Sequence, residues 1–74
     1  MIKQEHVVEA HTAAAQEHEN TAKSHRSAAE HCSKGNHEGC EHHAKVALDH
    51  SAKAHEASKS AHEKSAIPVA AGVR

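Results

Sequence analysis

The chain has 74 residues, of which 36% are hydrophobic, and it contains no Phe, Trp or Tyr. A chain of this length forms at most one domain, and most of its hydrophobic residues are alanines, which bury little area each. Any core is therefore small, and histidines, a metal or a partner chain must add to it. Nine Lys and Arg are balanced by ten Asp and Glu. Because the aromatic side chains that stack on bases are also absent, we expect no nucleic-acid partner.

The sequence favours a cytoplasmic protein without a membrane partner. No stretch approaches the roughly 18 apolar residues of a membrane span. Met1 to Lys3 are followed by acidic and polar residues rather than by the apolar core of a signal peptide. In a reducing compartment, two cysteines are thiols or metal ligands more readily than a structural disulfide.

A first helix is predicted over about residues 3–34. This segment contains no Gly or Pro and is dominated by residues that favour helix. Two columns of residues along it alternate three and four positions apart, as in a helix that packs on a partner. One column holds Val8, Ala15, Ala22 and Ala29, and the other holds His11, His18, His25 and Cys32.

A turn is predicted at residues 35–36, followed by a second helix over about residues 37–66. Gly35 suits the left-handed position just past a helix end, and Asn36 suits the N-cap of the next helix. Glu38 adds a favourable negative charge in the first turn. Pro68 disfavours helix at the residue before it, so residues 67–74 are expected to form an extended or frayed tail.

The second helix has its own pair of columns, formed by Cys40, Ala47, Ala54 and Ala61 and by His43, His50 and Ala57. If the chain reverses at residues 35–36, opposed residues have numbers that sum to about 72. Cys32 then faces Cys40, and at nearly every other level a large residue faces a small one, as close packing requires. We therefore predict a single all-α domain over 1–74, an antiparallel two-helix hairpin with a coiled-coil-like Ala/His seam.

A flanking stripe on each helix favours association of hairpins into a bundle. The stripes consist of small residues and hydroxyls, namely Val7, Ala14, Thr21 and Ala28, and Ala44, Ser51, Ser58 and Ser65. Together with the small core they predict a homo-oligomer, whose geometry stays open.

Histidines in adjacent layers of the seam form one candidate metal site. His25, His43 and His50 would lie in successive layers, and neutral imidazole is the commonest protein ligand for Zn, Ni and Cu. The alternative is that these rings only cover alanine methyl groups and reach water at one nitrogen. The histidines outside the seam are expected on the solvated surface: His6, His31, His37, His42, His55 and His62.

The turn offers a more specific candidate site. Cys32 and Cys40 face each other, and His37 and His43 each lie three residues from Cys40. Two thiolates with one or two imidazoles would make a tetrahedral zinc-type site. Two alternatives stay open, because the cysteines could be small buried hydrophobic residues or could form a disulfide across the hairpin.

The sequence predicts a non-enzymatic protein. A cysteine near a histidine is the minimum for nucleophilic catalysis, but there is no third orienting group, and a two-helix hairpin offers no concave pocket. One hypothesis is a protein that binds or buffers a transition metal. The other is a self-associating structural module without a specific metal, whose seam of neutral histidines makes it less stable below about pH 6.5.

The chain resembles a group of small bacterial proteins rich in His and Ala. These proteins have repeating AAxHH units and a central GxHExxxHHA segment, which stands here as GNHEGCEHHA over residues 35–44. The resemblance covers about residues 11–63. It implies a bacterial, non-enzymatic helical protein and supplies no catalytic residues. Cys32 and Cys40 stand where His or Ala is more usual in that group, and several of its His doublets are single histidines here.

Overall fold

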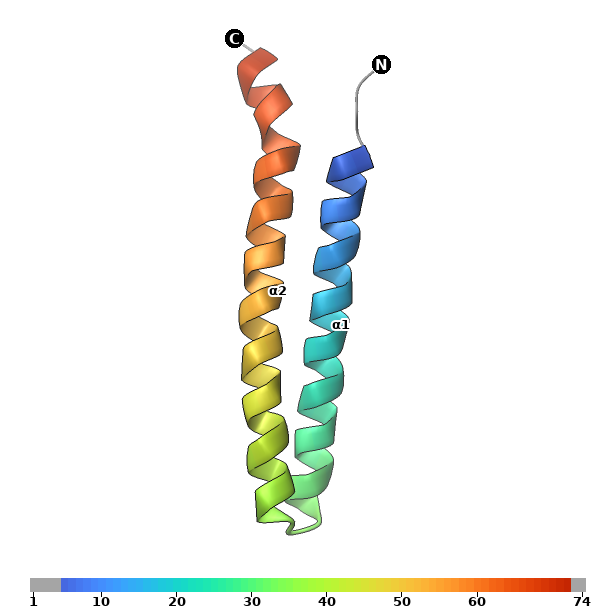
Figure 1. Cartoon of the computed structure of the whole chain (residues 1–74), viewed down its shortest axis with the longest axis vertical. Helices are drawn as coiled ribbons and strands as arrows, with labels where there is room; N and C mark the ends of the chain where they lie inside the picture. Colours follow the sequence, from blue (N-terminus) through green and yellow to red (C-terminus); the bar gives the residue numbers. More distant parts are fainter. Residues whose placement is uncertain (1–4, 73–74) are drawn as a thin grey trace.

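The fold is a hairpin of two long helices. A computed structural model describes residues 5–72, and the side chains of residues 5–65. Helix α1 spans Glu5–Ser33 and helix α2 spans His37–Gly72. The two run antiparallel, side by side along their length, with the turn at one end and the start of α1 and the end of α2 at the other (Figure 1). The predicted all-α antiparallel hairpin is confirmed.

The turn forms through the two residues that the sequence singled out. Gly35 has a φ of 78°, which glycine adopts without steric cost. The N–H of Asn36 donates to the carbonyl of His31 at 2.9 Å, a bond typical of the Schellman end of a helix. Asn36 then caps α2, because its Oδ1 accepts from the N–H of Gly39 at 3.0 Å.

The end of α2 differs from the prediction. The helix continues through Ile67 and Pro68 to Gly72, so the expected tail is wrong for residues 67–72. Proline lacks one N–H and therefore removes a backbone hydrogen bond, but it does not forbid helix on either side. The flanking alanines Ala66, Ala70 and Ala71 favour its continuation. Residues 3–4 of the predicted first helix and residues 73–74 of the predicted tail lie outside the described residues.

The contact face of α2 is the predicted one, whereas that of α1 is shifted by one residue. Ala47, Ala54 and Ala61 are exposed by 0%, 1% and 1%. On α1, Ala14 is buried, while Val8 is 59% exposed. The contact face of α1 consists of Val7, Ala10, Ala14, Glu17, Thr21, Ser24, Ala28 and His31, which are buried or half-buried. The predicted seam position of His11, His18 and His25 is therefore wrong, since all three are exposed.

The shift has a steric reason. One residue along an α-helix turns the face by about 100°. The observed face is built mostly from small side chains, which allow two helices to approach closely, whereas the predicted face would have inserted three imidazoles between them. At the edge of the contact two of those imidazoles instead reach across to serines of α2.

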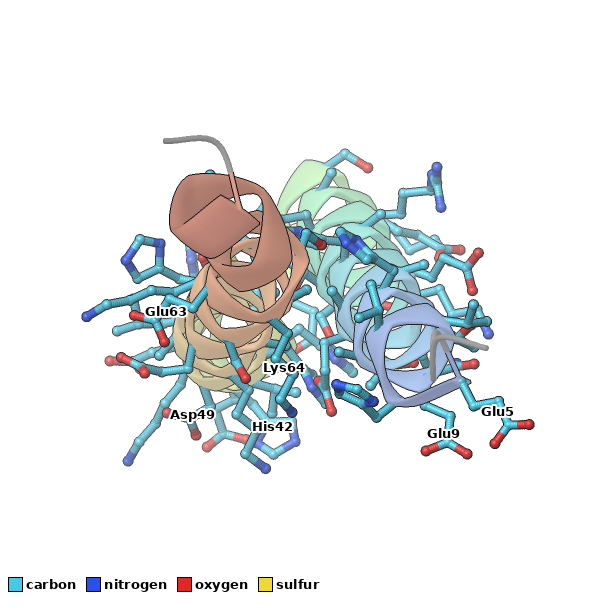
Figure 2. All side chains as sticks on the ribbon, turned by 90° about the horizontal axis from the view of Figure 1, so that it is seen from above. Glu5, Glu9, His42, Asp49, Glu63 and Lys64 are labelled. Carbon is cyan, nitrogen blue, oxygen red and sulfur yellow. A yellow bond between two sulfur atoms is a disulfide. The ribbon has the colours of Figure 1, made fainter. Side chains whose placement is uncertain are left out.

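The two broad faces of the hairpin differ in charge. On one side, here called the charged face, lie Glu9, Lys23 and Glu30 of α1 and Asp49, Lys53, Glu56 and Glu63 of α2. Figure 2 shows Glu9, His42 and Asp49 projecting from this side. The opposite side, here called the His/Ala face, comprises Val8, His11, Ala15, His18, Ala22, His25, Ala29 and Cys32 of α1 and Glu41, Ala44, Leu48, Ser51, His55, Ser58, His62 and Ser65 of α2. Over residues 5–72, neither helix holds a stretch long and apolar enough to cross a membrane.

Candidate metal centre

The two cysteines join the helices beside the turn. Cys32 in the last turn of α1 and Cys40 in the first turn of α2 form a disulfide, with Cα atoms 4.8 Å apart. Their predicted opposition is confirmed, and of the three alternatives the structure has the disulfide. Metal ligation by sulfur needs the thiolate. These two ligands therefore become available only when the disulfide is reduced.

Three imidazoles that lie within three residues of a disulfide cysteine in the sequence contact one another at the turn end of the hairpin. The rings of His31 and His43 are stacked, with centroids 4.7 Å apart and an interplanar angle of 13°. The ring of His42 meets His43 edge-on at a centroid distance of 5.1 Å. His43 was predicted at this site, but His31 and His42 were assigned to the solvated surface. The signal for His31 was present in the sequence, because it immediately precedes Cys32 and lies opposite the residues that follow Cys40.

His31 is held by the residues that make the turn. The Nδ2 of Asn36 donates to its Nδ1 at 3.1 Å, so the proton of the neutral ring resides on Nε2. Gly39 makes room for this arrangement. A Cβ at position 39 would lie 2.7 Å from Nδ2 of Asn36 and 2.8 Å from Nδ1 of His31. The cap of α2 and the absence of a side chain at Gly39 thus fix the His31 ring against the start of α2.

The other predicted ligands are dispersed. His37 is exposed at the start of α2, and His25 is exposed on the His/Ala face. His50 lies in the helix contact, about 15 Å along α2 from Cys40. The structure therefore does not assemble the predicted group of His25, His43 and His50. The described residues contain no group of three or more His, Cys, Asp or Glu arranged to hold a metal ion.

His50 is paired with Glu17 inside the helix contact. Its Nδ1 lies 3.5 Å from Oε1 of Glu17, and both side chains are 30% exposed. Neither of these two buried atoms has a hydrogen-bond partner within the described part of the chain. A carboxylate and an imidazole facing each other offset part of the cost of burying both. The pair therefore belongs to the packing of the hairpin.

Histidines and serines form a second set of contacts at the edge of the His/Ala face. Nε2 of His11 lies 2.8 Å from Oγ of Ser65, and Nε2 of His18 lies 2.7 Å from Oγ of Ser58. The Ser65 hydroxyl donates to the carbonyl of Ala61 at 2.8 Å, so it accepts from His11. The sequence showed both columns, but only the structure paired them. These bonds tie the two helices together at intervals of seven residues.

No protein-family model, curated protein or solved structure matches this chain. The candidate centre consists of side chains that the hairpin itself brings together. These are the two sulfurs that link the helices and the imidazoles that stack beside them.

Proposed function

We propose that the reduced chain is a non-enzymatic protein that binds or buffers a transition metal at the turn of the hairpin. The observation that carries the proposal is that the Cys32–Cys40 disulfide and the stacked rings of His31 and His43 join the same turns of the two helices. Sulfur and nitrogen ligands together suit zinc or Cu(I) better than they suit hard cations. A reducing compartment such as the cytoplasm would keep the chain in its binding form.

Reduction and metal binding are coupled in this proposal. A dithiol reductant delivers two electrons and two protons to the disulfide, which becomes two thiols while the reductant forms its own disulfide. Binding of the metal then releases the two thiol protons, since the ligands are thiolates. The oxidised chain lacks both ligands. Metal affinity therefore depends on the redox state of the chain.

The geometry of the turn supports a tetrahedral ligand set. Two thiolates on one zinc ion, each at about 2.3 Å, lie roughly 3.8 Å apart. Cα atoms 4.8 Å apart can present them at that separation by rotation of the side chains. His43 follows Cys40 by three residues on the same side of α2 and supplies the first imidazole. His37 precedes Cys40 by three residues and is the candidate fourth ligand.

His31 has a supporting role in this set. Its Nδ1 accepts from Asn36, and coordination through Nε2 would require the proton to move to Nδ1 and this bond to break. We therefore assign His31 to the orientation of the His43 ring through stacking. His25 and His50 lie outside the ligand set.

Titration of the untagged chain with Zn(II), Ni(II) and Cu(I) tests the proposal. The reduced, metal-free chain should bind one equivalent of Zn(II) or Cu(I) with a Kd below about 1 μM. The oxidised chain should bind at least about 100-fold more weakly, because it lacks two of the ligands. A result in which the two redox forms bind equally would contradict the proposal.

Substitutions separate the ligands from the other histidines. The C32S/C40S variant should lose the site, and H43Q should weaken it by about 10–100-fold. H55Q is the matched control, because His55 is an exposed histidine of α2 far from the turn, and it should bind as the wild type does. Binding that survives C32S/C40S would show only a weak association with scattered histidines.

A second candidate function is that of a self-associating structural module without a specific metal. It is favoured by the core, whose buried hydrophobic residues over the described side chains are four alanines: Ala14, Ala47, Ala54 and Ala61. Four methyl groups bury little area for a hairpin of this length. A metal-free chain that is fully helical, with a melting temperature that rises with concentration, would support this function.

A further inference from the structure

We propose that the His/Ala face is the surface on which a second copy of this chain docks, so that two hairpins form a four-helix bundle. This inference rests on the second candidate function and names the surface through which the chains associate. It is independent of the metal centre. The second stripe of α1, from Val8 to Cys32, has the spacing of a packing helix, and its alanine column is exposed at Ala15 and Ala29.

Helix α1 carries two such stripes rather than one. The stripe that contacts α2 includes the buried Ala14. The second stripe is displaced by one residue and runs from Val8 to Cys32, with the same alternation of three and four positions. One residue corresponds to about 100° around the helix. Two stripes nearly at right angles are what a helix at the corner of a four-helix bundle needs, because it touches two neighbours there.

The outer column of the second stripe is exposed at Val8, Ala15 and Ala29, whereas its histidines at 11 and 18 reach serines of α2. Val8 is 59% exposed, and Leu48 on the same face is 69% exposed. These are the exposed large hydrophobic residues of the part of the chain whose side chains are described. Both lie on the His/Ala face. The His/Ala face therefore exposes one large apolar side chain on each helix, which a docked partner would cover.

The charge pattern indicates that the occupant is a second copy. Among the sixteen side chains that define the His/Ala face, Glu41 is the single Lys, Arg, Asp or Glu. A face with almost no charge is complementary to itself, because two copies meet without like-charge repulsion. A strongly charged partner would find no matching groups on it. The isologous contact that two copies make is the usual arrangement of a homodimer.

The size of the face is sufficient for a stable contact. The hairpin measures 57 Å by 19 Å across its broad side, so this side has a projected area on the order of 1,000 Å². A standard interface buries about 800 Å² on each partner. Small residues such as Ala15, Ala22 and Ser51 on the face let the backbones of two hairpins approach closely. The imidazoles between them would fill the remaining space.

Sedimentation equilibrium of the full oxidised chain tests the interface. At tens of micromolar and pH 8, the wild type should have twice its chain mass of 7.9 kDa. A15E places a charge in the middle of the His/Ala face and should weaken the dimer at least about 10-fold. The matched control is A13E, because Ala13 is also an exposed alanine of α1 but lies on the other side of the helix. It should remain dimeric.

A second measurement needs no substitution. The methyl resonances of Leu48 should shift on dilution of the wild type, while those of Val46, on the opposite side of α2, should not. Three outcomes would overturn the inference. A monomeric wild type would also remove the second candidate function. If A15E and A13E weakened the dimer equally, or if dilution shifted the methyl resonances of Val46 rather than those of Leu48, the chain would still self-associate but not through the His/Ala face.

Discussion

Reduction of the Cys32–Cys40 disulfide should lower the free energy of unfolding by about 2.5 kcal/mol. The two residues are separated by eight positions, and in the chain-entropy treatment the stabilisation grows with the logarithm of the loop that the bond closes. A loop this short is near the low end of that scale. For a domain of this size, about 2.5 kcal/mol corresponds to a fall in Tm of about 10–20 °C.

Circular dichroism at 222 nm measures the shift. The oxidised and reduced chains are heated at the same chain concentration, and the buffer contains a chelator so that no bound metal contributes. The C32S/C40S variant is the control, since a reductant should not change its Tm. A reductant-induced shift below about 3 °C, or an equal shift in the control, would refute the reasoning, because the bond would then not constrain the unfolded chain.

Three further predictions concern the turn and the helix contact. G35A should lower the free energy of unfolding by about 1–2 kcal/mol, because Gly35 has a φ of 78° and a left-handed backbone is unfavourable for alanine. A Cβ at this position would meet open space, so no steric clash adds to the effect. An unchanged Tm would contradict this prediction. Replacing Gly by Ala in a helix usually stabilises it by about 1 kcal/mol. G39A should give no such gain, because its Cβ would lie 2.8 Å from Nδ1 of His31. The ring ¹⁵N resonances of His31 should also shift in this variant. A full gain with unmoved resonances would argue against the close approach. A double-mutant cycle of E17A and H50A, measured by urea unfolding, should give a coupling below about 1 kcal/mol, since both side chains are partly exposed; a coupling above about 2 kcal/mol would show a fully desolvated pair.

The sequence was sufficient to predict the hairpin and its turn. A long segment without Gly or Pro, followed by Gly35 and Asn36, permits one reversal of the chain, and both residues act as predicted. The register followed from the short turn, so Cys32 was correctly placed opposite Cys40. Local propensity and chain connectivity determine these features. No knowledge of side-chain packing is needed for them.

The end of α2 was less predictable from local rules. Pro68 was taken to end the helix, yet α2 continues to Gly72. The rule against helix before a proline is a preference of limited strength, and residues on both sides of Pro68 favour helix. The candidate site was also incomplete from the sequence, because stacking of His31 on His43 depends on the cap by Asn36 and on the space at Gly39.

The sequence by itself determined two helices, their antiparallel pairing and the opposition of the cysteines, because turn chemistry and helix periodicity are local properties. Only the tertiary structure decided which face of α1 packs against α2. The two stripes of α1, headed by Val7 and Val8, differ by one residue, and each combines one valine and three alanines with polar side chains. In a chain so rich in alanine, the burial energy of the two stripes is nearly equal. Steric fit therefore decides which stripe packs against α2. It places the imidazoles of His11 and His18 at the edge of the contact, where they form hydrogen bonds with serines of α2.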